Sequence, residues 1–132
     1  MPASRLPRVR LTAVPHDGVF VVRGDELDER VLTEDARRFR ARFPDWGRFG
    51  ISAFYAASDA EVDALCEAKL SAFPTVAVFR RDDLVASGLL VVPTFRTPHV
   101  TIAHDELEEL VRRLLGCGHV DRINPYHERE ED

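Results

Sequence analysis

Three short strand-like segments follow one another with no long helix between them, and this spacing constrains the fold most. The segments cover residues 75–79, 89–92 and 99–103, and only a turn or a single helical turn, closed by Gly88, separates the first two. Parallel neighbours need a long crossover of about a dozen residues, whereas antiparallel neighbours need only a short connection. We therefore expect consecutive strands to pair antiparallel.

Three helices are predicted from capping residues and apolar spacing. Thr33 is expected to cap the first, which ends before Pro44. Ser58 is expected to begin the second helix and Asp105 the third. The predicted buried faces follow helical spacing and comprise Ala36, Phe39 and Phe43, then Val62, Leu65, Cys66 and Leu70, then Leu107, Leu110, Val111, Leu114 and Leu115.

The order of these elements predicts an α+β fold in a single globular domain, residues 1–127, followed by an acidic, disordered tail at residues 128–132. We expect a mixed, mostly antiparallel sheet with about three helices packed mainly on one face. The further strands are predicted at residues 8–14, 19–22 and 51–56, with an edge strand within residues 119–126.

The net charge of −5 argues against broad, sequence-independent nucleic-acid binding, which requires a basic surface. A local basic patch is still compatible with this charge, because five arginines surround Phe39, Phe43 and Trp46. Such a patch favours RNA binding, whereas runs of charge are usually solvated helix faces, and both interpretations stay open. The five are Arg37, Arg38, Arg40, Arg42 and Arg48.

Cys66 and Cys117 lie far apart and match no metal-binding spacing, so we expect reduced thiols, no metal and no cofactor. Residues 1–10 contain no apolar run of signal-peptide length. No segment reaches the roughly 20 apolar residues that cross a bilayer. Lys69 is the only lysine among many arginines, which suggests a GC-rich genome. These features predict a bacterial, cytoplasmic protein with no membrane partner.

The best candidate for chemistry lies within residues 96–102, where His99 and Thr101 fall on one face of a predicted strand. Histidine transfers protons near neutral pH, and threonine donates to phosphate oxygens. The segment resembles one copy of the His-x-Thr-hydrophobic motif of two-histidine phosphoesterases, which act on RNA ends and cyclic nucleotides. That family uses two copies, and this chain has one. The alternative is that both are ordinary strand residues.

A second candidate follows the apolar strand at residues 19–22, where Arg23 and Gly24 occur. This arrangement is similar to the first-strand arginine of ADP-ribosyltransferases, which holds the phosphates of a nicotinamide dinucleotide. The resemblance implies a serine or tyrosine on a central strand, a role that Ser52 fits, and a catalytic glutamate, which has no persuasive counterpart. The alternative is a turn in which Arg23 is solvated or paired with Asp25.

Together these residues predict a small phosphate-directed enzyme acting on RNA or a nucleotide, toxin-like in size and chemistry, with His99 as general acid or base and Thr101 beside it. The alternative is a non-catalytic module that binds a protein, as a neutraliser or a subunit of a complex. A homo-oligomer formed through edge strands is a third interpretation. The candidate substrate-binding residues are Arg23, Arg96, Ser52, Tyr126 and His127.

Overall fold

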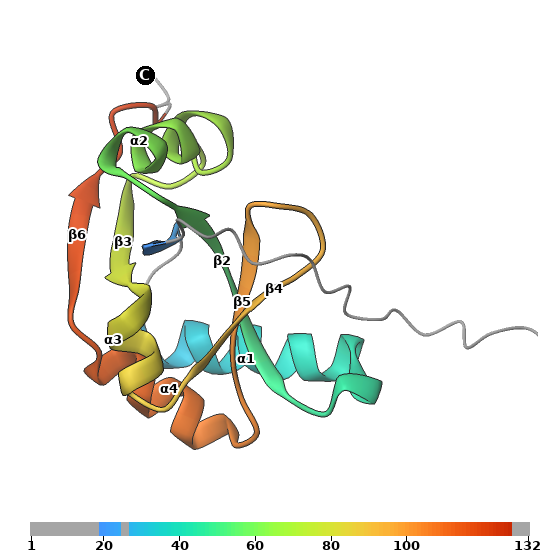
Figure 1. Ribbon diagram of the computed structural model, residues 1–132. Coiled ribbons are helices and arrows are strands. Elements are labelled where there is room, and N and C mark those ends of the chain that lie inside the picture. Colours follow the sequence, from blue (N-terminus) through green and yellow to red (C-terminus); the bar gives the residue numbers. More distant parts are fainter. Residues whose placement is uncertain (1–18, 25–26, 128–132) are drawn as a thin grey trace, which may run out of the picture.

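The computed structural model describes residues 19–24 and 27–127. The strand predicted at residues 8–14 and the acidic tail at residues 128–132 lie outside the described residues. The described chain forms one six-stranded sheet with helices on both faces, which is an α+β fold (Figure 1).

The sheet has the strand order β4-β5-β2-β1-β3-β6, and every neighbouring pair is antiparallel. This confirms the antiparallel pairing expected between residues 89–92 and 99–103, because β4 pairs with β5. The pairing expected between residues 75–79 and 89–92 is wrong, because β3 pairs with β1 and β6, and three strands separate it from β4. Residues 49–53 of β2 extend beyond the end of β1 while they pair with β5. The strands are β1 (Phe20–Arg23), β2 (Phe49–Ala56), β3 (Thr75–Arg80), β4 (Leu90–Pro93), β5 (His99–His104) and β6 (His119–Ile123).

Three helices of ten or more residues and two shorter ones connect the described strands. α1 packs against β2 and α4. α2 lies at the top of the view in Figure 1, away from α1 and α4. The helices are α1 (Glu29–Arg42), α2 (Asp59–Ala68), α3 (Arg81–Ala86) and α4 (Leu107–Gly116), with the 3-10 turn η1 at Pro44–Trp46.

Neighbouring residues of β1 enter two different apolar clusters, because successive side chains of a strand point to opposite faces of the sheet. Val21 packs in the larger cluster with side chains of α1, α3 and α4, such as Leu32 and Leu110. Val22 packs in the smaller cluster with side chains of α2, such as Val62. The helices of the described chain therefore lie mainly on one face, as predicted, with α2 on the other.

Asp28, and not Thr33 as predicted, caps the N-terminus of α1. The Asp28 carboxylate accepts a hydrogen bond from the backbone nitrogen of Val31 at 3.2 Å. The prediction from the sequence was wrong because the apolar spacing that located the helix was counted from Ala36, more than a turn inside it. Thr33 is an interior residue of α1.

The predicted cap of α2 is confirmed, whereas the predicted cap of α4 is wrong. Ser58 accepts a hydrogen bond from the backbone nitrogen of Glu61 at 3.2 Å, and the Glu61 carboxylate accepts one from Ala57. At α4 the N-cap is Glu106, with no side-chain capping bond. The carboxylate of Asp105 instead accepts a hydrogen bond from Arg48 Nε at 3.2 Å.

Asn124 ties the end of β6 to the loop after α2. Its buried side-chain amide donates to the carbonyl of Leu70 at 2.8 Å and to that of Phe73 at 3.1 Å. Its side-chain oxygen accepts a hydrogen bond from Tyr126 N at 2.9 Å. Residues 124–126 are therefore fixed against the loop after α2.

Cys66 and Cys117 are both buried and form no disulfide. Burial raises the pKa of each thiol, which disfavours the reactive thiolate. Among the described helices, none combines the length and apolar character that crossing a membrane requires.

Replacing Asp28 by alanine tests the position of the α1 cap. We expect Asp28→Ala to lower the free energy of unfolding by about 1 kcal/mol, because an N-terminal backbone donor loses its acceptor. The matched variant Thr33→Ala should leave stability unchanged or slightly raised, because alanine is the better residue inside a helix. Urea denaturation of both variants gives the comparison, and a larger loss for Thr33→Ala would contradict the assigned cap.

Candidate functional site

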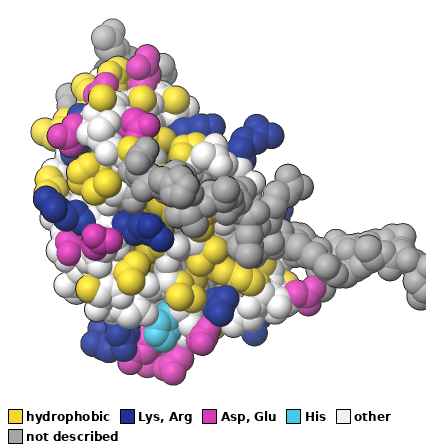
Figure 2. Space-filling model, in the orientation of Figure 1, with side chains coloured by type: hydrophobic (Ala, Val, Ile, Leu, Met, Phe, Trp, Pro, Cys, Tyr) yellow, Lys and Arg dark blue, Asp and Glu magenta, His cyan; other side chains and the backbone are white. Residues whose placement is uncertain are grey.

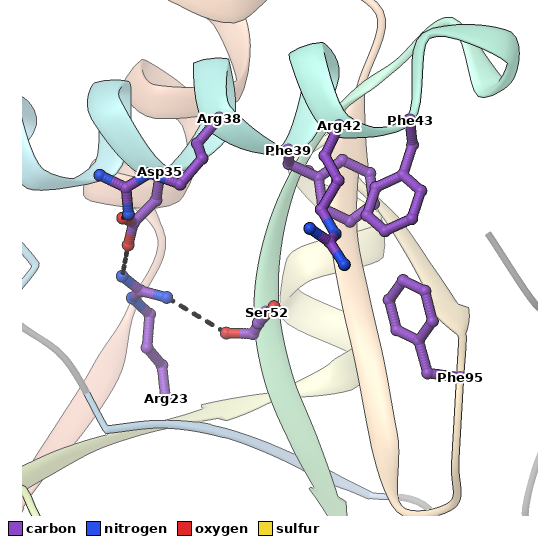
Figure 3. Close-up of a pocket in the computed structure, with 9 residues that line it drawn as sticks. Arg23, Asp35, Arg38, Phe39, Arg42, Phe43, Ser52 and Phe95 are labelled. Atoms are coloured by element: carbon purple, nitrogen blue, oxygen red, sulfur yellow. Dashed lines mark hydrogen bonds and ion pairs between the residues drawn. The ribbon is translucent and has the colours of Figure 1, made fainter. Parts of the chain in front are cut away.

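A cavity of about 500 Å³ lies between the C-terminal half of α1, the beginning of β2 and the connection from β4 to β5 (Figure 3). The side of α1 that faces it carries residues 35, 38, 39 and 42, which follow the i, i+3, i+4, i+7 spacing of one helix face. The lining residues are Arg23, Asp35, Arg38, Phe39, Arg42, Phe43, Gly50, Ser52 and Phe95.

Arg23 forms one wall of the cavity and is only 4% exposed. Its Nη2 donates to the Asp35 carboxylate at 2.6 Å, and its Nη1 donates to the backbone carbonyl of Ser52 at 3.2 Å (Figure 3). The guanidinium therefore joins β1, α1 and β2. Pairing of Arg23 with Asp25, considered from the sequence, involves a residue outside the described chain.

Two more arginines, Arg38 and Arg42, line the cavity, and both belong to α1 and are exposed to solvent. The Arg38 side chain is 76% exposed, with Nη1 at 3.6 Å from the second oxygen of Asp35. The guanidinium carbon of Arg42, an exposed residue, lies 5.7 Å from the ring centre of Phe43. The described lining thus holds three arginines and one carboxylate, a combination that attracts anions and offers paired donors to phosphate.

Aromatic rings form the side of the cavity opposite Arg23. The ring centres of Phe39 and Phe43 are 4.8 Å apart, and those of Phe43 and Phe95 are 5.3 Å apart. Phe95 has a backbone φ of +63°, a left-handed conformation that is uncommon for a residue with a side chain. Such strain is concentrated at functional sites, where the surrounding structure holds the residue in place.

Gly50 forms the floor of the cavity and permits α1 to approach β2 closely. A Cβ atom at this position would lie 2.6 Å from the Thr101 methyl carbon and 2.8 Å from the Phe39 ring. Both distances are too short for a real contact, so a larger residue would displace Phe39 or β5. The Thr101 methyl carbon therefore lies on the side to which a side chain at position 50 would project, next to the Phe39 ring.

His99 and Thr101 lie on one face of β5, as the sequence predicts, and a third residue connects them. The hydroxyl of Thr94 hydrogen-bonds with His99 Nδ1 at 2.9 Å and with the Thr101 hydroxyl at 2.7 Å. Thr94 and Thr101 are fully buried, whereas His99 is partly buried. Thr94 belongs to the same connection as Phe95, so the hydrogen bonds also hold that connection against β5.

The imidazole of His99 lies beside Phe95 and Phe54, with ring centres 5.1 Å and 5.5 Å away. Burial lowers the pKa of His99 below its ordinary value, and a hydrogen bond with the backbone of Thr94 partly opposes this effect. The neutral imidazole is therefore favoured at neutral pH. Neither His99 nor Thr101 is among the residues that line the cavity. The ring of Phe95 lies between the cavity and His99, because it contacts both the Phe43 ring and the imidazole.

The remaining predicted site residues lie elsewhere. Arg96 is exposed on the connection from β4 to β5. The Tyr126 hydroxyl donates to Asp63 of α2 at 2.6 Å, and His127 Nδ1 donates to the carbonyl of Ser71 at 3.1 Å. The structure therefore brings Arg23 to the backbone of Ser52, and His99 to Thr101, while Tyr126 and His127 contact α2 and the loop after it.

The predicted arginine patch divides over several surfaces. Arg38 and Arg42 line the cavity, whereas Arg37 faces a separate hollow between α1 and α4. Arg40 donates to the carbonyl of Pro44 at 3.2 Å, and Arg48 pairs with Asp105. Sequence reasoning did not select Asp35, Thr94 or Phe95 as site residues.

Comparisons with models of protein families, with curated proteins and with solved structures found no match. Within residues 19–24 and 27–127, no group of three His, Cys, Asp or Glu side chains is arranged to hold a metal ion. The chemistry of the cavity and of the residues behind it is therefore the basis for a functional proposal.

The lowered pKa of His99 predicts a pH dependence of stability. The unfolded chain binds a proton near pH 6.5, whereas the folded chain resists protonation, so the free energy of unfolding should fall as the pH drops below that value. In His99→Gln this contribution is absent. We expect the stability of the wild type relative to the variant to decrease between about pH 7.5 and pH 5, with a slope of at most about 1.4 kcal/mol per pH unit. Denaturation at several pH values measures it, and a constant difference would contradict the assignment.

Proposed function

We propose that this protein is a phosphate-directed enzyme that binds a nucleotide or an RNA in the cavity between α1 and β2 and uses His99 as general acid or base. The observation that carries the proposal is the convergence of Arg23, Arg38 and Arg42 beside an aromatic wall. Phosphate groups and aromatic bases are the two chemical parts of a nucleotide, and this surface offers a complement to each.

The phosphate is bound by the exposed arginines. Arg38 and Arg42 present planar guanidinium groups that can each donate two hydrogen bonds to phosphate oxygens. Arg23 lies deeper, where Asp35 and the Ser52 carbonyl hold it. Because Asp35 balances the charge of Arg23, the net positive charge of the site comes from Arg38 and Arg42. Because the protein is acidic as a whole, this local charge favours one bound phosphate group over binding along an extended nucleic acid.

The base lies against the aromatic wall. Phe43 and Phe95 offer ring surface within the cavity, and stacking of a base on an aromatic ring contributes about 1–3 kcal/mol. The cavity volume of about 500 Å³ falls in the range of about 300–1,000 Å³ that is typical of small-ligand sites.

In the proposed reaction His99 exchanges a proton with the ligand from behind Phe95, outside the residues that line the cavity. Its Nδ1 is engaged by Thr94, so Nε2 is the ring nitrogen that exchanges a proton with the ligand. Nε2 is a base only when Nδ1 carries the ring hydrogen, and that hydrogen then donates to Thr94, which in turn donates to Thr101. The reactive oxygen of the ligand must reach His99 past the ring of Phe95.

Binding of adenosine monophosphate tests the role of the arginines. Replacing both Arg38 and Arg42 by glutamine should raise the dissociation constant at least about tenfold, because hydrogen bonds to charged groups contribute about 1.5–3 kcal/mol each. Calorimetric titration at low salt measures the effect. Adenosine without phosphate should bind the wild type and the double variant equally.

Arg37→Gln is the matched control, since Arg37 is exposed on the same helix and lies outside the cavity. It should bind the monophosphate like the wild type. Equal losses in the control and in the double variant would show that net charge, and not the cavity, governs binding, and absence of binding to the wild type would overturn the proposal.

His99→Ala tests the catalytic part with short phosphorylated RNAs and cyclic nucleotides as substrates, and with chromatography of the products. We expect hydrolysis by the wild type and a loss of about 100-fold or more in the variant, the usual contribution of a general acid or base. Thr94→Val, which keeps the side-chain shape and removes the hydroxyl, should lower the rate less and leave binding intact. Full activity of a folded His99→Ala variant would contradict the assigned role.

A further inference from the structure

We propose that β6 pairs with β6 of a second copy of this chain, antiparallel, so that two six-stranded sheets join into one. Among the strands that the structure describes, β6 is an edge strand with a neighbour on one side only, and it runs along the left margin of Figure 1. Val120 is 67% exposed and Ile123 is 77% exposed, the largest values among the large hydrophobic residues that the structure describes. Hydrophobic side chains are visible at the same margin in Figure 2.

Within residues 19–24 and 27–127, no strand pairs with the side of β6 that faces away from β3. Asn124 N donates to the carbonyl of Pro74, which continues the pairing of β6 with β3. Because backbone groups alternate in direction along a strand, those of His119, Asp121 and Ile123 point away from β3. A free strand edge with apolar side chains is a template for another strand.

Symmetry restricts the register of such a pair. Paired residues must face the same side of the joined sheet, so a twofold register is centred on one residue. Centring on Asp121 or on Arg122 would place like charges directly opposite each other, which is destabilising. Centring on either end residue of β6 would overlap the two strands by one residue only.

Centring the pair on Val120 avoids like charges and gives hydrogen-bond complementarity. Val120 then lies opposite Val120 of the second copy, and His119 lies opposite Asp121 of that copy in both directions. Within one chain His119 Nε2 is 3.1 Å from Asp121 Oδ1, so both side chains project from the same face and an exchange of partners needs little movement. His119 and Asp121 also supply the outward backbone groups, and these pair in this register.

The opposite edge of the sheet is less suited to pairing. β4 ends at Pro93, which has no backbone N–H to donate. Leu90 of β4 is 42% exposed, which is less than the exposure of Val120 or Ile123 of β6. We therefore assign the interface to β6. This interface does not depend on the function of the cavity.

Cysteine cross-linking tests the register. Directly opposed residues of the pair at Val120 have Cα atoms about 4.5 Å apart, within the range of a disulfide. We expect Val120→Cys to form a covalent dimer under mild oxidation, and Asp121→Cys and Arg122→Cys to form much less. The native chain is the control, because Cys66 and Cys117 are buried. Preferential cross-linking through position 121 or 122 would overturn the register.

Sedimentation of the full native chain tests the association itself. We expect a dimer whose fraction rises with concentration, and Val120→Asp should be monomeric at every concentration. Val85→Asp is the matched control, since Val85 is 52% exposed and belongs to α3 and not to an edge strand, and it should dimerise like the wild type. A native chain that stays monomeric up to the highest soluble concentration, or a Val120→Asp variant that still dimerises, would overturn the proposal.

Discussion

The guanidinium group of Arg23 is removed from water at the end of β1, and a buried charge needs an opposite charge and hydrogen-bond acceptors to be tolerated. Asp35 supplies the charge from α1, and the Ser52 carbonyl supplies a further acceptor from β2. These contacts fix the helix relative to two strands. Since Arg38 and Arg42 lie on the same helix face as Asp35, their position over the cavity depends on this ion pair.

Local chemistry in the sequence was sufficient to predict the class of fold. The short connection between β4 and β5 indicated their antiparallel pairing, and alternation placed His99 and Thr101 on one face. The equally short connection between β3 and β4 was misleading, because these two strands do not pair. Helix caps were less predictable. Asp28 caps α1 outside the stretch of regular apolar spacing, and Asp105 pairs with a distant arginine in place of capping α4.

The site was predictable only in part, because its decisive contacts join residues distant in sequence. Nothing in the sequence indicated that Arg23 would reach Asp35, which lies 12 residues further along the chain. The conformation of Phe95 is imposed by the connection around it, so no local pattern revealed it. Thr94 belongs to no motif that the sequence reveals, although its hydroxyl hydrogen-bonds with both His99 and Thr101.

The strand order also has a consequence for synthesis of the chain. β3 pairs with β1 on one side and with β6 on the other, and about 40 residues of intervening chain, including β4, β5 and α4, separate β3 from β6. While the ribosome adds those residues, the outer edge of β3 has no native neighbour. A nascent chain thus exposes the run from Thr75 to Phe79, rich in valine, at a sheet edge prone to aggregation until the last strand is made.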